Sequence, residues 1–151
     1  MSTGNDRWWQ QARQRCAAAN VQLTDKRIKL LEVLLAADRP LSAYELAAAY
    51  AQQHSTDLKP MSVYRMLDAL VAAHLIHRLA STNTFMICNA DDHGADDGVQ
   101  FLICDSCSQV IETPLGKSMS STMDSNAKKA GFAILHHQVE LHGVCQRCAT
   151  E

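Results

Sequence analysis

The sequence predicts an α+β protein that begins with a winged helix-turn-helix domain and ends with a small α/β domain. Three observations lead to this prediction. The first half of the 151-residue chain has helical periodicity and ends in two short β-like runs, whereas the second half alternates between strand and helix patterns. Charge divides the same way, because residues 1–80 carry a net +3 and residues 81–151 a net −5. Five of the six cysteines also lie in the second half, so the two halves have different functions.

The first half of the chain contains several residues typical of helix N-termini. Thr24 is a predicted N-cap, Ser42 and Glu45 match a capping box, and Pro60 lies in the first turn of a further helix. We therefore expect helices at residues 8–19, 25–37, 43–53 and 60–73. Wing strands are expected at residues 75–79 and 85–88.

Alternating apolar and polar residues predict strands at 99–104, 109–112 and 132–141, with a helix at 118–130 that Gly131 ends. We place the winged-helix domain at residues 1–88, with its wing at 75–88, and a hinge loop at 89–98. Residues 99–151 form a second domain with a thin core that a metal ion or a dimer interface would stabilise.

The strongest chemical signal is a pair of Cys-x-x-Cys motifs, Cys104 with Cys107 and Cys145 with Cys148. Each pair bends around a tetrahedral metal ion, and two pairs complete a four-thiolate shell. Because the protein supplies all four ligands, the site is closed and favours structural zinc over catalysis. The alternatives are unrelated thiols or a redox motif, although no thioredoxin-like pattern surrounds either pair.

A second, more scattered set of ligands spans the predicted wing and the segment after it. His77 lies on the first wing strand, Cys88 on the second, His93 in the acidic loop and Glu112 on a later strand. Together they would form a four-coordinate site, and its thiolate suits zinc better than magnesium or iron(II). The alternative is that Cys88 is a small buried apolar residue and His77 a surface residue of the wing.

The helix at residues 60–73 has polar residues near its start and an apolar stripe behind them. Lys59, Ser62, Tyr64 and Arg65 are residue types that contact phosphates and base edges in a major groove. The alternative is a solvated amphipathic helix. The same ambiguity holds for the basic cluster that contains Arg27. The position of the helix before a wing favours DNA.

These features together resemble the ferric uptake regulator (Fur) family, most closely its zinc uptake regulator (Zur) branch. The resemblance runs from about residue 21 to residue 148. The segments that carry it are Leu23-Thr24 with Arg27, Ser42 to Glu45, Ser62 to Asp68, Phe85 to Cys88, Phe101 to Cys107, and Gly143 to Cys148.

The resemblance implies a homodimeric transcriptional repressor that binds palindromic operator DNA when a regulatory site holds zinc, and that controls zinc-uptake genes. An arrangement of two dimers per operator stays open, and an iron- or other metal-responsive repressor is the alternative. About two Zn²⁺ per chain are expected, one structural and one regulatory. The resemblance also implies that residues 99–151 are the dimerisation and metal-binding domain. By position, the resemblance implies DNA contacts at Tyr64, Arg65 and Tyr44. The regulatory ligands correspond to His77, Cys88, His93 and Glu112, with Asp92, Asp96 or Asp97 as substitutes for His93.

Other classes of protein are less consistent with the sequence. Zinc-enzyme signatures such as His-Glu-x-x-His are missing, so no enzyme activity is expected; a non-DNA interaction module stays open. No apolar run approaches the roughly 20 residues of a membrane span, and residues 1–14 have no signal-peptide core. We therefore expect a cytoplasmic protein without a membrane partner, in which disulfides are disfavoured.

Overall fold

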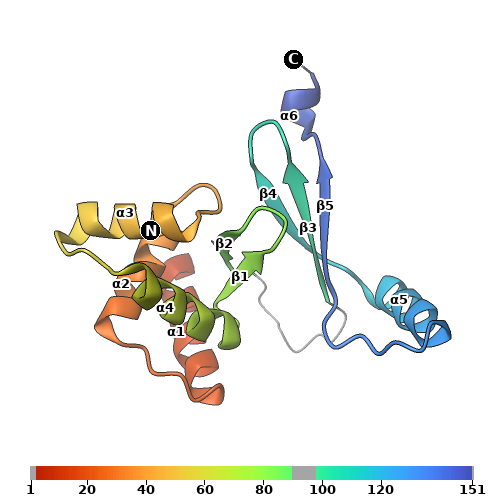
Figure 1. Ribbon diagram of the computed structural model, residues 1–151, viewed down its shortest axis with the longest axis horizontal. Helices are drawn as coiled ribbons and strands as arrows, with labels where there is room; N and C mark the ends of the chain where they lie inside the picture. Colours follow the sequence, from red (N-terminus) through yellow and green to blue (C-terminus); the bar gives the residue numbers. More distant parts are fainter. Residues whose placement is uncertain (1–2, 90–97, 151) are drawn as a thin grey trace. The chain divides into compact units, whose positions relative to one another are not determined.

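The structure, a computed structural model, describes residues 3–89 and 98–150 of the chain. The chain divides into an N-terminal unit, Met1–Cys88, and a C-terminal unit, Asn89–Glu151 (Figure 1). Helices and a hairpin make up the first unit, and a three-stranded sheet with helices makes up the second. The predicted α+β fold class is confirmed.

The N-terminal unit contains four helices and then a two-stranded antiparallel hairpin. Its elements are α1 (Thr3–Ala18), α2 (Asp25–Ala36), α3 (Ala43–His54), α4 (Pro60–Ala72), β1 (Ile76–Leu79) and β2 (Thr84–Ile87). An isolated bridge adds to the hairpin, because the N–H groups of Leu41 and Phe85 each donate to the other residue's carbonyl oxygen, at 3.0 and 2.8 Å. This bridge ties the α2–α3 connection to the hairpin and completes a winged helix.

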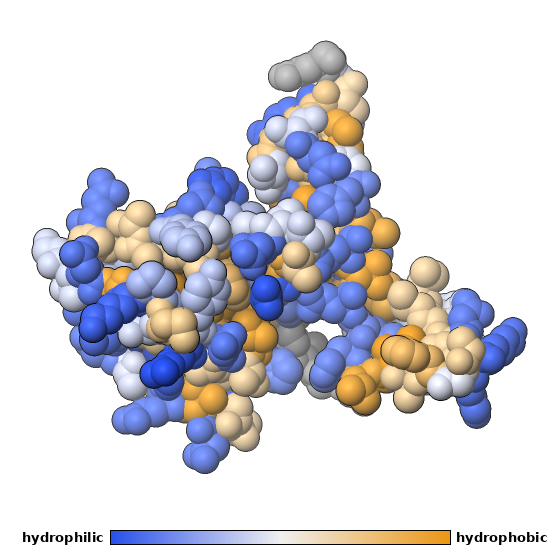
Figure 2. Space-filling model, viewed as in Figure 1, coloured by the Kyte–Doolittle hydropathy of each residue, from blue (hydrophilic) through white to orange (hydrophobic). Residues whose placement is uncertain are grey.

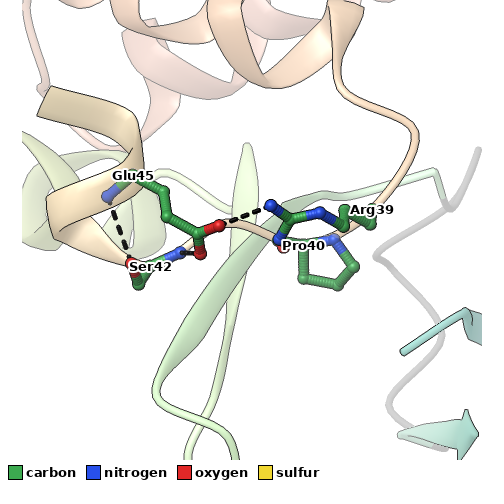
Figure 3. Close-up of polar contacts among 4 residues, drawn as sticks. All are labelled: Arg39, Pro40, Ser42 and Glu45. Atoms are coloured by element: carbon green, nitrogen blue, oxygen red, sulfur yellow. Dashed lines mark hydrogen bonds and ion pairs between the residues drawn. The ribbon is translucent and has the colours of Figure 1, made fainter. Parts of the chain in front are cut away.

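Side-chain caps start α2 and α3 at the predicted positions. The Thr24 hydroxyl accepts from the Arg27 N–H at 3.3 Å. In α3 both bonds of the capping box are present: the Ser42 hydroxyl accepts from the Glu45 N–H at 3.1 Å, and the Glu45 carboxylate accepts from the Ser42 N–H at 3.0 Å (Figure 3). The Arg39 guanidinium donates to the same carboxylate, which fixes the start of α3 against the preceding turn.

Leucine is the most frequent residue in the core of the N-terminal unit. Several leucines have no exposed surface: Leu30, Leu31, Leu46, Leu67 and Leu70 on helices, and Leu75 between α4 and β1. Burying one such side chain contributes about 1.5–3 kcal/mol. Cys16 also belongs to this core, with 2% of its surface exposed. It is therefore a packing residue.

The C-terminal unit holds a sheet of order β4–β3–β5, in which β3 pairs antiparallel with β4 and parallel with β5. Its elements are β3 (Val99–Cys104), β4 (Val110–Pro114), α5 (Lys117–Lys129), β5 (Gln138–Gly143) and the short α6 (Gln146–Ala149). Parallel strands need a long connection, which β4 and α5 provide.

Two element predictions were wrong in extent, and one element was missed. α1 begins at Thr3 rather than residue 8, and α6 was not predicted. The strand predicted at 132–141 instead covers Gln138–Gly143, and it starts late because its partner β3 begins at Val99 opposite Gln138. Gly98 passes so closely that an added Cβ would lie 2.4 Å from the His137 Cβ.

The surfaces of the two units differ in their apolar content. Figure 2 shows hydrophobic residues at the surface of the C-terminal unit. Its exposed large apolar side chains are Leu102, Ile111, Met119, Phe132, Leu135, Leu141 and Val144. In the N-terminal unit only Tyr44 and Met61 are of this kind among the described residues. No described helix has the length and apolar character needed to cross a membrane.

Candidate metal centre and nucleic-acid interface

The C-terminal unit brings the four predicted structural ligands together. Sulfur atoms of Cys104, Cys107, Cys145 and Cys148 all lie within 4.8 Å of one another. Cys104 is the last residue of β3, and Cys107 lies in the turn that follows. Cys145 is the N-cap of α6, and Cys148 lies within this helix. The pairing of β3 with β5 carries these distant segments to one end of the sheet, where Cys104 lies opposite Gly143.

The cluster has the size and donors of a zinc site. A tetrahedral ion with Zn–S bonds of about 2.3 Å separates its ligands by about 3.8 Å. The Cys107 and Cys145 sulfurs lie 3.8 Å apart. Four thiolates at this spacing suit zinc and leave no position for a substrate. The residues therefore fit a structural zinc ion.

Hydrogen bonds prepare part of this cluster to carry negative charge. The Cys145 N–H donates to the Cys104 sulfur at 3.3 Å. This bond, with a second from the Cys107 backbone, lowers the pKa of the Cys104 thiol to about 6. The pKa of the Cys148 thiol instead rises to about 12, chiefly through its hydrogen bond with Cys145. The thiols thus share protons unequally, and a dication would allow all four to ionise.

Two ligands of the predicted regulatory site meet within the N-terminal unit. His77 lies on β1 opposite Met86, and Cys88 follows β2 directly, where its N–H donates to the Leu75 carbonyl oxygen at 2.9 Å. A ring nitrogen of His77 and the Cys88 sulfur lie within 4.8 Å of each other. Cys88 was expected on the second strand and lies one residue beyond it.

The other two predicted regulatory ligands belong to the C-terminal unit. Glu112 lies on β4, where its carboxylate accepts the Asn89 N–H at 3.2 Å. His93 lies outside the described residues, as do Asp92, Asp96 and Asp97. The regulatory ligand set as a whole stays a prediction.

The helix α4 separates its polar and apolar residues by face. Val63, Met66, Leu67 and Leu70 are buried, and their spacing places them on one stripe toward the core. Lys59, Ser62 and Arg65 are exposed, and Tyr64 is half-buried. In helix-turn-helix proteins the recognition helix is held by one face in this way and presents its opposite face to a groove of DNA.

A shallow apolar hollow separates the beginnings of α3 and α4. Its lining residues are Ala43, Tyr44, Ala47, Pro60, Val63 and Tyr64. Tyr44 is 75% exposed, so two of the predicted DNA contacts converge here from different helices. Arg27 is engaged locally, because its guanidinium donates to the Gln22 carbonyl oxygen at 2.6 Å. Its contact with DNA stays a prediction.

Two polar contacts were not found from the sequence. Arg39 bonds to Glu45 beside the capping box, and Arg147 donates to the Cys107 sulfur at 3.9 Å. The second had a local signal, because Arg147 lies inside the motif Cys145–Cys148. Residues between paired ligands lie next to the metal by necessity.

Comparisons with known proteins agree over nearly the whole chain. The model of the ferric uptake regulator family matches residues 18–142. The zinc uptake regulation protein of Escherichia coli strain K12 is 35% identical over 138 residues, which are 91% of this chain and 79% of that protein.

Solved structures give the same result. A zinc uptake regulator complexed with zinc and DNA matches with a TM-score of 0.85 and 32% identity, over 99% of this chain and 97% of that one. Holo XcZur matches with a TM-score of 0.77 and 33% identity, over 91% of this chain and 94% of that one.

Proposed function

Since the chain belongs to the ferric uptake regulator family, we propose that it is a zinc-responsive transcriptional repressor. It binds operator DNA as a homodimer when its regulatory site holds zinc, and it controls zinc-uptake genes. The observation that carries this proposal is the match, over almost the full length of both chains, to a zinc uptake regulator complexed with zinc and DNA. No enzymatic reaction is part of the proposal.

The four-cysteine cluster holds the structural zinc ion. Cys104, Cys107, Cys145 and Cys148 complete its coordination, so the ion is not exchanged during regulation. When bound, it supplies a cation that allows four neighbouring thiols to ionise together and fixes α6 against the end of β3. The cluster thereby stabilises a unit that buries few side chains of its own.

The helix α4 reads the operator. Arg65 donates to base edges or phosphates, with Tyr64 and Ser62 beside it and Lys59 at the helix start. Tyr44 on α3 adds a contact from across the apolar hollow. One α4 helix reads one half-site, so a palindrome requires two copies of the chain.

The C-terminal unit provides the dimer interface. β5 bonds only to β3 among the described strands, which leaves it at an edge of the sheet. Leu141 on this strand is 48% exposed, and Leu135 in the segment before it is 85% exposed. An apolar edge strand is a site for pairing with another chain, and a second copy related by two-fold symmetry satisfies both partners.

Regulatory zinc binds His77 and Cys88 from the N-terminal unit together with His93 and Glu112 from the C-terminal unit. The adjacent ligand atoms of His77 and Cys88 support half of this site. A zinc ion held by both units would restrict their relative orientations and fix the spacing of two α4 helices on a palindrome. By linkage, DNA would tighten the binding of regulatory zinc.

The proposal is tested by selecting duplexes from a random-sequence DNA pool with the zinc-loaded full-length protein. We expect a palindrome to be enriched, and we expect its affinity to fall on mild chelation and return with Zn²⁺. Restoration by Fe²⁺ but not by Zn²⁺ would identify an iron-responsive repressor instead. Failure to enrich any sequence would remove the DNA-binding function.

The variant Arg65→Ala tests the reading helix on the selected duplex. Loss of a bidentate base contact costs about 1–3 kcal/mol, so we expect affinity to fall roughly fivefold to 150-fold at constant salt. Lys129→Ala, which removes one positive charge from α5, is the matched control. Equal affinities of the two variants would exclude Arg65 from the interface.

A further inference from the structure

The segment between the second pair of cysteines places an arginine side chain in direct contact with the thiol cluster. Arg147 lies in α6 between Cys145 and Cys148, and its guanidinium donates to the Cys107 sulfur at 3.9 Å. The thiols reciprocally raise the pKa of Arg147, first through this hydrogen bond and then through charge. The contact joins the second pair to a sulfur of the first.

The four sulfurs differ in their protection from solvent. Cys104 is buried and accepts the Cys145 N–H, whereas Cys107 is the exposed member of the cluster. Cys107 is therefore the ligand that an electrophile in solution reaches most readily. Arg147 donates to this sulfur, so its side chain lies where protection is weakest.

Charge gives this contact its chemical importance. Four thiolates around one Zn²⁺ carry a net charge of about −2. A guanidinium beside them offsets part of this charge, and its N–H bond withdraws electron density from the sulfur. Offsetting the cluster's negative charge favours retention of the metal, and the N–H bond reduces the nucleophilicity of the bound thiolate.

We propose that Arg147 is a positioning residue of the four-cysteine site that retains its zinc and protects Cys107 from electrophiles. This inference rests on the proposed structural zinc site and adds a residue outside the ligand set. The short helix α6 holds the backbone of Arg147, because the Thr150 hydroxyl donates to the Arg147 carbonyl oxygen at 3.0 Å.

The test uses the full-length protein carrying Cys88→Ser, so that regulatory zinc does not contribute. Zinc release to a chromogenic chelator and alkylation of Cys107 by N-ethylmaleimide, located by peptide mass spectrometry, are measured on the zinc-loaded protein. In alkylation a carbon–sulfur bond forms, the adjacent maleimide carbon takes a proton from water, and the zinc–sulfur bond breaks. We expect Arg147→Ala to accelerate zinc release and Cys107 alkylation about tenfold each. This is the low end of the effect expected when a hydrogen-bond partner of a metal ligand is removed.

Three comparisons separate this role from a general loss of structure. Gln146→Ala changes the neighbouring exposed residue of the same motif and should leave both rates unchanged. Arg147→Lys keeps the charge and should restore most of the protection. Since the contact is exposed, 1 M salt should reduce the difference between Arg147→Ala and the parent.

The outcomes also separate this inference from the site on which it rests. If Cys145→Ser does not lower the zinc content of the parent protein, the proposed structural zinc site itself is wrong. If zinc is present but Arg147→Ala matches the parent, or Gln146→Ala accelerates release equally, the role of Arg147 is overturned.

Discussion

The two units of this chain achieve stability by different means. Among the described residues, the buried apolar side chains number twenty-one in the N-terminal unit and four in the C-terminal unit. Exposed large apolar side chains show the opposite distribution, with two in the first unit and seven in the second. The N-terminal unit therefore has its own hydrophobic core. The C-terminal unit has a thin core, which the proposed zinc ion and second copy of the chain would supplement.

The comparison assigns a separate function to each unit. A core of leucines holds α4 by one face and leaves its polar face for a ligand. The C-terminal unit instead has four clustered thiols and an apolar sheet edge, which we propose hold a zinc ion and a second copy of the chain. Changes in one unit should consequently leave the folding of the other intact.

The largest expected effect comes from Cys145→Ser. Structural zinc contributes about 10 kcal/mol or more to the folding of small zinc domains, so loss of one ligand should unfold the C-terminal unit. We expect fast amide hydrogen exchange in β3, β4 and β5, with protection retained in α2, α3 and α4. Cys16→Ala, which removes a thiol outside the cluster, should keep its zinc. Full protection of β3 in zinc-free Cys145→Ser would show that the C-terminal unit does not need the metal.

The converse change is Leu46→Ala in the N-terminal core. Leu46 has no exposed surface, and truncating a buried leucine costs about 2–5 kcal/mol. Urea unfolding followed by hydrogen exchange should show this loss in the N-terminal unit. Zinc content and dimerisation should stay at the parental level, and a parallel loss of zinc would contradict the independence of the units.

The apolar edge of the C-terminal sheet is tested with Leu141→Glu. A charge placed in the centre of an interface costs about 2 kcal/mol, so we expect the dimer to weaken about thirtyfold. Sedimentation equilibrium of the zinc-loaded protein measures the change. Met61→Glu introduces the same charge at an exposed apolar residue of the N-terminal unit and should leave the dimer unchanged. Equal weakening by both variants would argue against β5 as the interface.

The smallest effect concerns the cap of α3. Hydrogen bonds from Arg39 and then from the Ser42 backbone lower the pKa of Glu45 from 4.5 to about 2. The associated stability is present above pH 4.5 and is lost as the pH falls toward 2. Glu45→Gln keeps an acceptor for Ser42 but removes the charge, so it should cost under about 1 kcal/mol at neutral pH. Thermal unfolding at several pH values should show that the difference from the parent shrinks between pH 4.5 and 2. A constant difference would exclude the ion pair as its source.

Local signals were sufficient to predict most of the fold. Thr24, Ser42 and Pro60 marked helix starts that the structure confirms to within one residue, because capping and proline effects act over a single turn. The last strand was predicted to begin six residues too early, because alternation alone does not show where its partner strand begins. Its start depends on Val99 and Gly98, which are distant in sequence.

The candidate sites also differed in how well local sequence signals predicted them. Paired Cys-x-x-Cys motifs predicted a cluster that the structure assembles, because each pair is a local unit with strict spacing. The contact of Arg147 with Cys107 joins the two pairs, and no spacing rule reports a contact between segments 40 residues apart. The full regulatory ligand set is a proposal because its members are scattered and His93 lies outside the described residues.

The most direct test of zinc-regulated repression compares Cys88→Ser with the parent while the four-cysteine site stays loaded. Affinity for the selected palindrome is measured by fluorescence anisotropy as a function of free Zn²⁺, with Cys16→Ala as the matched thiol control. We predict that zinc raises the affinity of the parent and the control about tenfold or more, a typical coupling between two sites, and leaves that of Cys88→Ser unchanged. A zinc response of Cys88→Ser equal to that of the parent would contradict regulation through this residue.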